Sequence, residues 1–389
     1  AEASGVLPMG PNAPVCLGGR TPAASVRGGG SAVGEIEREL FSPGDATVCP
    51  ITPLRGRYGG TPGRGRAGGT GEAGGRAAYG FSEMRGWRPD MEDAVCHHHP
   101  VPGETDVGLF GVFDGHGGAA CSQYLADRLL AEWQGTDEWL SGECSTDVLG
   151  RSLESTCAKL EKAMRCAPGP AYTSCGSTGV IGLVTPSDVV VANVGDSRAV
   201  LVTRNAAGLL AAVPMSVDHT PKLTNERERI EGAGMTVGKI VAADGTVHWK
   251  VFRDRPASND CLAMSRAFGD FDYKSVPDLP DHEQPVVAEP DVVVHRRGPD
   301  DAFLVLACDG VWDVMTNAEV AEFLYGRIED GTADPERIAA ACDDLLRECI
   351  VRKSRDNMTV LVVALSEPSL EQEGGGGEEG RRILDFESK

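Results

Sequence analysis

The stretch DVGLFGVFDGHGG, residues 106–118, joins an almost unbroken apolar run to an acid and a cluster of glycines. The run at 106–113 predicts a buried strand that ends at a glycine turn. The next segment, SQYLADRLLAEW at 122–133, has apolar residues at helical spacing and predicts a helix. Asp114 and His116 are therefore expected in the turn between a buried strand and a helix.

Working outward from this unit, the same two patterns recur along the chain. Strands 188–194 and 199–203 are joined by the short turn GDSR, which favours antiparallel pairing. Hairpin-linked strands with helices grouped at intervals predict a layered α+β domain and not a regular βαβ alternation. The other expected strands are at 178–184, 302–307 and 358–365, and the other expected helices are at 147–166, from Asn317 onward and near 335–351.

Composition excludes several classes of protein. The chain has 389 residues, of which 41% are hydrophobic and 24% are charged, as in soluble proteins that bury a core. Its longest apolar runs, near 303–307 and 360–365, fall far short of the roughly 18 residues that a membrane span needs. With 58 acids against 37 bases the net charge is -21, which disfavours nucleic acid and anionic lipid as partners. A cation, or a ligand held by cations, is the expected partner.

The cysteines indicate a reducing compartment. Twelve are spread along the chain without a CxxC pair, so a thiolate zinc site or a redox pair is disfavoured. A disulfide framework is also a poor interpretation for a chain this long. We expect reduced thiols and an intracellular protein, cytoplasmic, nuclear or both.

Three segments differ in composition. Residues 1–80 hold 20 of the 50 glycines and eight arginines, with too little apolar content to offset chain entropy. The sequence therefore predicts a disordered Gly/Pro/Arg-rich arm at 1–78, one domain at 79–366 and a disordered acidic, Gly-rich tail at 367–389.

Acids stand where the predicted strands begin or end. A single acid there is usually a turn former or a helix cap. Four in one domain, each beside a glycine or an asparagine, indicate a convergent set, and MED at 91–93 adds two more. Converging carboxylates repel one another, so the set implies bound cations, and oxygen ligands select Mg²⁺ or Mn²⁺. The four acids at strand ends are Asp114, Asp196, Asp309 and Asp356.

His116 lies two residues beyond Asp114 and is flanked by glycines. Such a histidine can be a metal ligand, a general acid or a filler of the turn. We favour the general acid, because the glycines leave the imidazole uncovered and able to meet a substrate.

Eight motifs follow one another along the chain: GWRPDMEDA, GVFDGHGG, GSTGVIGLV, ANVGDSRAVL, SVDHTP, LAMSRAFGD, LACDGVWDVM and DNMTVLVV. Taken together, they resemble those of the type 2C protein phosphatases, a family of metal-dependent Ser/Thr phosphatases. The resemblance covers about residues 79–366. It implies a hydrolase with a four-layer α/β/β/α sandwich, two antiparallel sheets flanked by helices, with a dimetal site at one edge.

The resemblance also implies roles for individual residues around two ions. Asp114 would bridge both, the Gly115 carbonyl would bind one, and Asp309 and Asp356 would bind the other. The residues that match a third, weaker metal position are Asp196, Asp309 and Asp313.

Further roles follow from the same resemblance. Glu92 and Asp93 would hold metal-bound waters, and Arg88 would grip the phosphate, a task suited to a planar fork of donors. A dimetal-bridged hydroxide would attack phosphorus in line without a phosphoenzyme, and His116 would protonate the departing oxygen. The expected partners are phosphorylated proteins, and we expect a monomer.

Rival interpretations remain at this stage. One is a phosphoprotein-binding scaffold without catalysis, and another is a two-metal nuclease or small-molecule phosphatase. A cysteine-dependent phosphatase is disfavoured, because Cys342 and Arg347, the one near match to its phosphate loop, lie in a helical pattern without glycines.

The sequence departs from the family pattern at 244–260, a polar addition in the flap beside the cleft that contains Trp249. Trp249 could tune the choice of peptide or simply anchor the flap.

Overall fold

The structure, a computed structural model, describes residues 54–55, 78–103, 106–167, 171–205, 207–241, 245–253, 261–328 and 335–365. All of them belong to one compact unit within residues 51–389. Most of the predicted arm and the whole of the predicted tail lie outside the described residues.

The first large sheet is antiparallel and has six strands. The last strand of the chain pairs with the first long one, since Leu361 lies opposite Phe81. In spatial order the strands are β1 (Leu54–Arg55), β2 (Tyr79–Met84), β17 (Met358–Ala364), β16 (Asp301–Ala307), β9 (Arg198–Arg204) and β10 (Leu210–Pro214).

The second large sheet is antiparallel and has five strands. The strands predicted at 106–113 and 178–184 are neighbours in this sheet, with Gly111 opposite Ile181. In spatial order the strands are β15 (Asp291–Arg296), β8 (Asp188–Val194), β7 (Gly179–Val184), β4 (Gly108–Phe113) and β3 (Ala94–His98).

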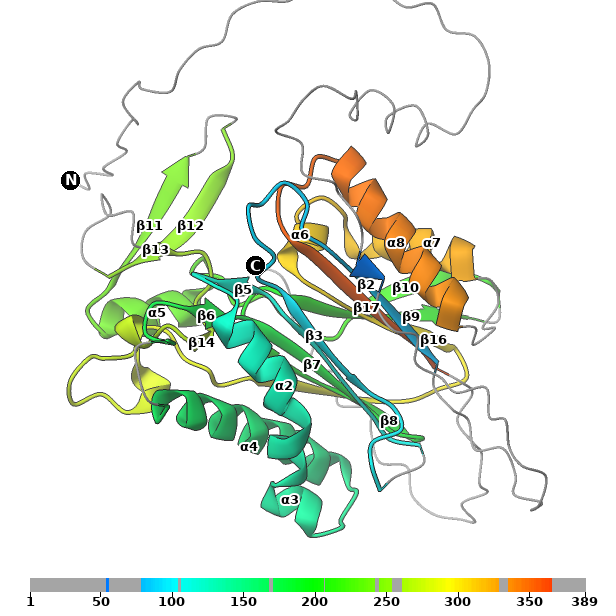
Figure 1. Cartoon of the computed structure of the whole chain (residues 1–389), viewed down its shortest axis with the longest axis horizontal. Coiled ribbons are helices and arrows are strands. Elements are labelled where there is room, and N and C mark those ends of the chain that lie inside the picture. The colour runs from blue at the N-terminus through cyan, green and yellow to red at the C-terminus, as the bar shows by residue number, and fades with distance from the viewer. Residues whose placement is uncertain are drawn as a thin grey trace, which may run out of the picture. The chain divides into compact units, whose positions relative to one another are not determined.

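Helices cover the outer face of each sheet (Figure 1). Helix α8 contacts β2 and β17, whereas α2 and α4 contact strands of the second sheet. The helices are α2 (Ala120–Gln134), α3 (Asp137–Leu140), α4 (Thr146–Arg165), α5 (Thr224–Gly232), α6 (Asp309–Trp312), α7 (Asn317–Ile328) and α8 (Pro335–Val351).

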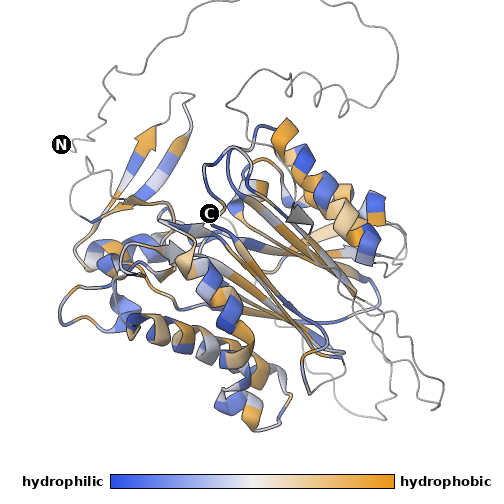
Figure 2. Cartoon of the chain, viewed as in Figure 1, coloured by the Kyte–Doolittle hydropathy of each residue, from blue (hydrophilic) through white to orange (hydrophobic). Residues whose placement is uncertain are grey.

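Side-chain alternation along the strands builds three core layers. In β16, Leu304 and Leu306 enter the layer between the two sheets, while Phe303, Val305 and Ala307 face α7 and α8. A strand buried on both faces must be apolar throughout, which is why the central strands are unbroken apolar runs. Figure 2 shows apolar residues along these strands and mixed residues on the covering helices.

The α/β/β/α sandwich predicted from the sequence is confirmed. The predicted helix at 122–133 is α2 at Ala120–Gln134, and the predicted helix at 147–166 is α4 at Thr146–Arg165. The sequence did not predict β1, β2, β3, β10 and β15 of the large sheets, or the short helices α3 and α6. In the flap it did not predict α5, the hairpin β11 (Thr236–Val241) and β12 (Val247–Phe252), or β13 (Cys261–Leu262).

A small three-stranded sheet, separate from the flap hairpin, carries His116 next to the site. Its strands have two residues each and lie beside the start of α2, which contacts β5 and β6. They are, in spatial order, β14 (Phe268–Gly269), β6 (Gly176–Ser177) and β5 (Gly115–His116).

The cysteines of the described segments are all free thiols, and seven of these ten side chains are buried. Among the described helices, none combines the length and the apolar character that crossing a bilayer requires.

Candidate active site

The sandwich brings the predicted acids to one end of its strands. Asp114 follows β4, Asp196 lies in the turn between β8 and β9, and Asp309 follows β16 at the start of α6. Asp356 comes two residues before β17, the antiparallel neighbour of β16. The end of one strand and the start of its antiparallel neighbour lie at the same end of a sheet, which brings Asp309 and Asp356 together. Asp114 and Asp196 reach the same region from the second sheet.

The raised pKa of Asp114 shows that the acids lie close together. Burial raises the pKa of Asp114 well above its usual range, and the charges of Asp93, Asp309, Asp196 and Asp356 raise it further. A carboxyl perturbed by four others lies at the centre of the cluster.

The acids around Asp114 respond in the same way. Burial and the neighbouring acids raise the pKa of Asp309 well above its usual range. Burial raises the pKa of Asp196 to about 6, helped by the charge of Asp218, and burial also raises the pKa of Asp313. Without nearby positive charge, these carboxyl groups resist losing their protons.

Unpaired oxygens fit the site to divalent cations. One carboxylate oxygen each of Asp93, Asp196 and Asp309 is buried without a hydrogen-bond partner among the described residues. Donor atoms of Asp93, Asp114 and Cys308 lie within 4.8 Å of one another. Buried oxygens without donors, in a set that carries excess negative charge, are what Mg²⁺ or Mn²⁺ would neutralise.

Cys308 is the one soft atom in this group, and the sequence analysis gave it no role. Its pKa is raised well above the usual range by burial and by the charges of Asp93 and Asp114. The backbone N–H of Thr359 donates to its sulfur at 3.1 Å. The thiol therefore stays protonated and is a poor nucleophile.

Gly115 is needed where the chain passes Glu92. A Cβ at position 115 would lie 2.3 Å from the Glu92 carbonyl oxygen and 2.7 Å from Oγ of Ser122. No side chain fits this gap, so glycine lets the backbone after Asp114 pack against the segment that carries Glu92 and Asp93.

Asn357, directly before β17 of the first sheet, holds the segment that carries Glu92 and Asp93. Its side-chain oxygen accepts from the backbone N–H of Glu92 at 2.8 Å, and its amide donates to the carbonyls of Arg85 and Asp90. Asp93 is held nearby, because the Thr359 hydroxyl donates to it at 2.7 Å. The loop between β2 and β3 is thereby tied to the start of β17.

Two predicted residues flank the acids with positive charge. Arg88, half exposed, has its Nη2 2.6 Å from Oδ2 of Asp356. His116 has its Nε2 2.6 Å from Oδ2 of Asp270, an acid to which the sequence analysis assigned no role. Burial lowers the pKa of His116, but the Asp270 carboxylate and the charges of Asp196 and Glu92 raise it, so the net shift is upward.

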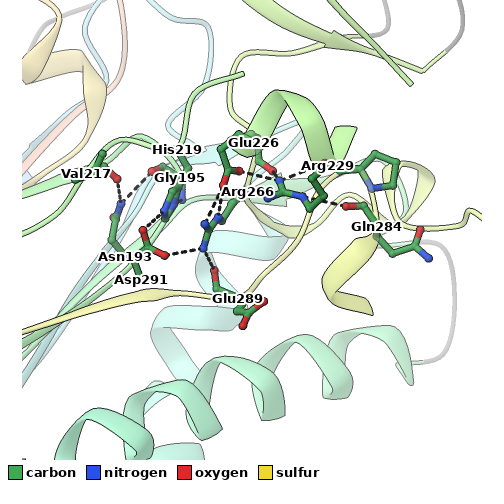
Figure 3. A network of polar contacts seen from close by, with 12 residues as sticks. Asn193, Gly195, Val217, His219, Glu226, Arg229, Arg266, Gln284, Glu289 and Asp291 are labelled. Carbon is green, nitrogen blue, oxygen red and sulfur yellow. Dashed lines mark hydrogen bonds and ion pairs between the residues drawn. The ribbon is translucent and has the colours of Figure 1, made fainter. Parts of the chain in front are cut away.

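A polar network holds the turn that carries Asp196 (Figure 3). Nδ1 of His219 accepts from the backbone N–H of Gly195 at 3.1 Å, and the Asn193 amide donates to the Gly195 carbonyl at 3.0 Å. Nε2 of His219 lies 3.1 Å from Asp291. The position of Asp196 is therefore set by residues of β8 and β15 and of the segment before α5.

The same network attaches the flap to the sandwich. Glu226 of α5 is fully buried and pairs with Arg229 and Arg266 at 2.8 Å each. Although burial raises its pKa, the two guanidinium groups hold it at about 2. Arg266 also reaches Asp291 at 2.9 Å, so one arginine connects the flap helix to the second sheet (Figure 3).

Asp218 is another acid that the sequence analysis did not assign. Its carboxylate accepts two hydrogen bonds from Arg198, at 2.9 and 2.6 Å, and Arg198 also donates to Asn317. Asp218, Asp270 and Cys308 all lie inside quoted motifs, SVDHTP, SRAFGD and LACDG, so the motifs could have indicated them.

The fold and the acid cluster define a metal-dependent hydrolase. A sequence profile described as "Protein phosphatase 2C" matches residues 77–358. The chain belongs to the protein phosphatase 2C family. It is accordingly a metal-dependent protein serine/threonine phosphatase.

Individual relatives agree with this assignment. A "Probable protein phosphatase 2C" of Caenorhabditis elegans is 36% identical over 292 residues, 74% of each chain. "Protein phosphatase 1B" of Mus musculus is 36% identical over 304 residues, 76% of this chain and 72% of that one.

Solved structures share the fold. The serine-threonine phosphatase 2C from Toxoplasma gondii superposes with a TM-score of 0.66 at 22% identity, over 82% of this chain and all of that one. A phosphatase from a pathogenic strain of the same organism gives a TM-score of 0.59 at 27% identity, over 75% and 93%.

Proposed function

We propose that this chain hydrolyses phosphoserine and phosphothreonine in proteins at the acid cluster around Asp114, by in-line attack of water and without a phosphoenzyme. The observation that carries the proposal is the convergence of buried, mutually repelling carboxylates from both large sheets at one end of the sandwich. The protonated thiol of Cys308 supports attack by water, because the cysteine nearest the acids is not a thiolate.

The residues that would hold two divalent ions are Asp114, as the bridging acid, and the Gly115 carbonyl, Asp309 and Asp356. Glu92 and Asp93 would act through waters, and the unpaired oxygen of Asp93 supports such a role. Divalent cations at such a cluster supply Lewis acidity and a water molecule activated near neutral pH. A third, weaker position would use Asp196, Asp309 and Asp313.

Arg88 would bind the phosphate. Its guanidinium is half exposed and sits beside Asp356, so one edge is anchored while other N–H donors stay free to meet phosphate oxygens. An exposed arginine next to buried acids also offsets part of the charge on an incoming dianion.

His116 would give a proton to the departing serine or threonine oxygen. An alkoxide is a strong base and must be protonated as the P–O bond breaks. His116 directly follows the Asp114–Gly115 turn, and the Asp270 carboxylate favours its protonated form.

The substrates would be phosphoproteins met by a monomeric catalytic domain at 79–366 inside the cell. The arm at 1–78 would take no part in catalysis and would act in targeting.

A phosphopeptide array read with and without Mn²⁺ tests this function. Metal-dependent release of phosphate from phosphoserine and phosphothreonine peptides, absent in Asp114→Ala, is the expected result. Binding of phosphopeptides without release would instead support a scaffold. Release that does not depend on added or bound divalent metal would contradict the proposal.

A further inference from the structure

His116 and Asp270 form a close side-chain pair that the established chemistry leaves unexplained. Their Nε2 and Oδ2 atoms are 2.6 Å apart, and the side chains are 25% and 3% exposed. The residues stand 154 positions apart in the chain, so only the fold brings them together. A short contact between a ring nitrogen and a buried carboxylate is a strong, directional interaction.

The small three-stranded sheet that carries His116 is built to allow this contact. In β6, Gly176 pairs with His116 of β5 on one side and with Gly269 of β14 on the other. A Cβ at Gly176 would lie 2.1 Å from Oδ2 of Asp270 and 2.5 Å from Nε2 of His116. The two side chains therefore meet in space that only a glycine leaves open.

Asp270 is held in an unusual backbone conformation to make the contact. Its φ is 49° and its ψ is 42°, the left-handed region that non-glycine residues seldom occupy. Its backbone N–H donates to the Cys175 carbonyl at 3.1 Å, and its carbonyl accepts from Tyr273 at 2.8 Å. Such a conformation persists where surrounding contacts impose it, and it is a known mark of functional positions.

Helix α4 supports the same segment from outside. Glu161 accepts from the backbone N–H of Gly269 at 3.0 Å and pairs with Lys274 at 2.7 Å. Lys274 also donates to the Ala267 carbonyl at 2.6 Å. The residues on both sides of Asp270 are thereby fixed to α4 through a half-buried acid and a buried lysine.

The contact leaves the two ring nitrogens of His116 in different situations. A carboxylate can only accept, so Nε2 of His116 carries the hydrogen of the short bond to Asp270. Nδ1 is shielded from solvent and has no hydrogen-bond partner among the described residues. Nδ1 is thus the ring nitrogen that Asp270 does not engage, and it is buried beside the site.

We propose that Asp270 is a positioning residue that fixes the His116 ring beside the acid cluster through the contact between Nε2 and its carboxylate. The inference rests on the proposed role of His116 as proton donor. In the step that this positioning serves, a proton of the His116 ring passes to the serine or threonine oxygen as the P–O bond breaks, the hydroxyl leaves, and solvent returns a proton to the ring.

The test compares Asp270→Asn with His116→Ala and with the double variant. Asparagine matches the shape of aspartate and tolerates the left-handed region, so the variant should keep the fold. Each protein is assayed with a phosphoserine peptide and with p-nitrophenyl phosphate, whose leaving group departs as a stable anion. We expect Asp270→Asn to lower kcat for the peptide at least about tenfold and to lower it much less for the aryl ester.

The double variant shows whether Asp270 acts through His116. In the His116→Ala background, Asp270→Asn should cause no further loss on the peptide. Independent, multiplying losses, or equal losses on both esters, would overturn the inference.

The chain offers a matched control in the pair His295 and Asp301. Nε2 of His295 lies 2.8 Å from Oδ2 of Asp301, and the side chains are 31% and 5% exposed, as in the first pair. Asp301→Asn should not distinguish the two esters. If Asp301→Asn lowered kcat for the peptide more than for the aryl ester as strongly as Asp270→Asn does, any buried histidine–aspartate pair would have this effect, and the inference would be overturned.

A second readout needs no substitution at Asp270. ¹⁵N-histidine NMR of the Mg²⁺-loaded protein, with the His116 signals identified by their loss in His116→Ala, reports which nitrogen carries hydrogen. Protonated Nε2 is the expected result, and an Nε2 without hydrogen would overturn the inference even if the variants failed to fold. If His116→Ala slowed both esters alike, the role of His116 itself would fail, which separates that outcome from a failure of Asp270 alone.

Discussion

The guanidinium of Arg88 and the carboxylate of Asp356 are joined at 2.6 Å, across 268 residues of sequence. One partner would bind phosphate and the other a metal ion, so the contact links the two halves of the proposed site. Because Arg88 is 53% exposed, the pair contributes little to stability, and its value lies in aiming the guanidinium.

Arg88→Ala should therefore act on substrate binding. Loss of charge-assisted hydrogen bonds of about 1.5–3 kcal/mol predicts a kcat/KM lower by roughly 10- to 100-fold, mostly through KM. Steady-state kinetics on a phosphopeptide measure this. The control is Arg128→Ala, which removes another half-exposed arginine in a 2.7 Å ion pair and should leave kcat/KM unchanged.

Asp114→Ala and Asp309→Ala should abolish turnover while the domain stays folded. Each removes one charge from a repelling, buried cluster, so the thermal midpoint of the metal-free protein should hold steady or rise. Differential scanning calorimetry in EDTA checks the midpoint, and assays at saturating Mn²⁺ check turnover. Retained activity in saturating Mn²⁺ would contradict the assignment of these acids.

The metal-free protein should lose stability as the pH rises from about 4 to 6. Burial raises the pKa of Asp93 to about 6, and Asp196 is raised similarly, so the folded state binds more protons than the unfolded chain in this window. The free energy of unfolding then falls with increasing pH, by up to about 3 kcal/mol for Asp93 alone at 1.36 kcal/mol per pKa unit.

Urea unfolding at several pH values measures this slope. Asp93→Asn should make it shallower in EDTA, since Asp196 still contributes, and saturating Mg²⁺ should abolish it in the wild type. Glu226 and Asp291 have pKa values of about 2 and act in the opposite direction below about pH 4.5, so the slope is read between pH 4.5 and 6. A stability that rises between pH 4.5 and 6 in EDTA would rule out a repelling cluster.

The sandwich could be predicted because its strands are buried on both faces. GLFGVF is apolar throughout, DVVVANV is apolar apart from Asp188 and Asn193, and α4 repeats its apolar residues at helical spacing. The flap lacks these signals. Helix α5 is TNERERIEG, and its buried Glu226 is satisfied by two arginines, one of them 40 residues away, which no local pattern indicates.

The acids of the site could be predicted from the sequence, but the partner of His116 could not. Acids at strand ends stand out in the sequence, and their convergence follows from strand order. The partner of His116 does not stand out, because Asp270 reaches it through three two-residue strands, a passing glycine and a left-handed backbone. These features depend on distant segments meeting, so only the folded chain shows them.

Trp249 should affect peptide choice through the shape of the flap. Its ring lies across from Lys239 of β11, with Nζ 4.4 Å from the ring centroid, and Arg227 of α5 is 5.9 Å away. The ring also packs on the apolar cluster beneath the hairpin. Trp249→Ala should change KM among phosphopeptides and spare p-nitrophenyl phosphate.

The control for that variant is Trp139→Ala, which removes a partly buried ring that packs at a tilt against Trp133, with the ring centroids 4.1 Å apart. It should lower the thermal midpoint without changing relative KM values. Equal losses on peptide and aryl ester in Trp249→Ala would show that the tryptophan is structural only.

His116→Ala gives the sharpest view of the chemistry. If His116 donates the proton, phosphopeptide hydrolysis should slow by roughly 10²- to 10⁴-fold, the usual range for a positioned acid, while p-nitrophenyl phosphate suffers much less. The reason is the leaving group, since a serine alkoxide needs a proton and p-nitrophenolate does not. A histidine that bound metal would instead slow both esters alike and raise the Mn²⁺ concentration required. A histidine that only filled the turn would do neither. Measuring kcat for both esters across Mn²⁺ concentrations separates these cases, and equal slowing of the two would show that the proton comes from elsewhere.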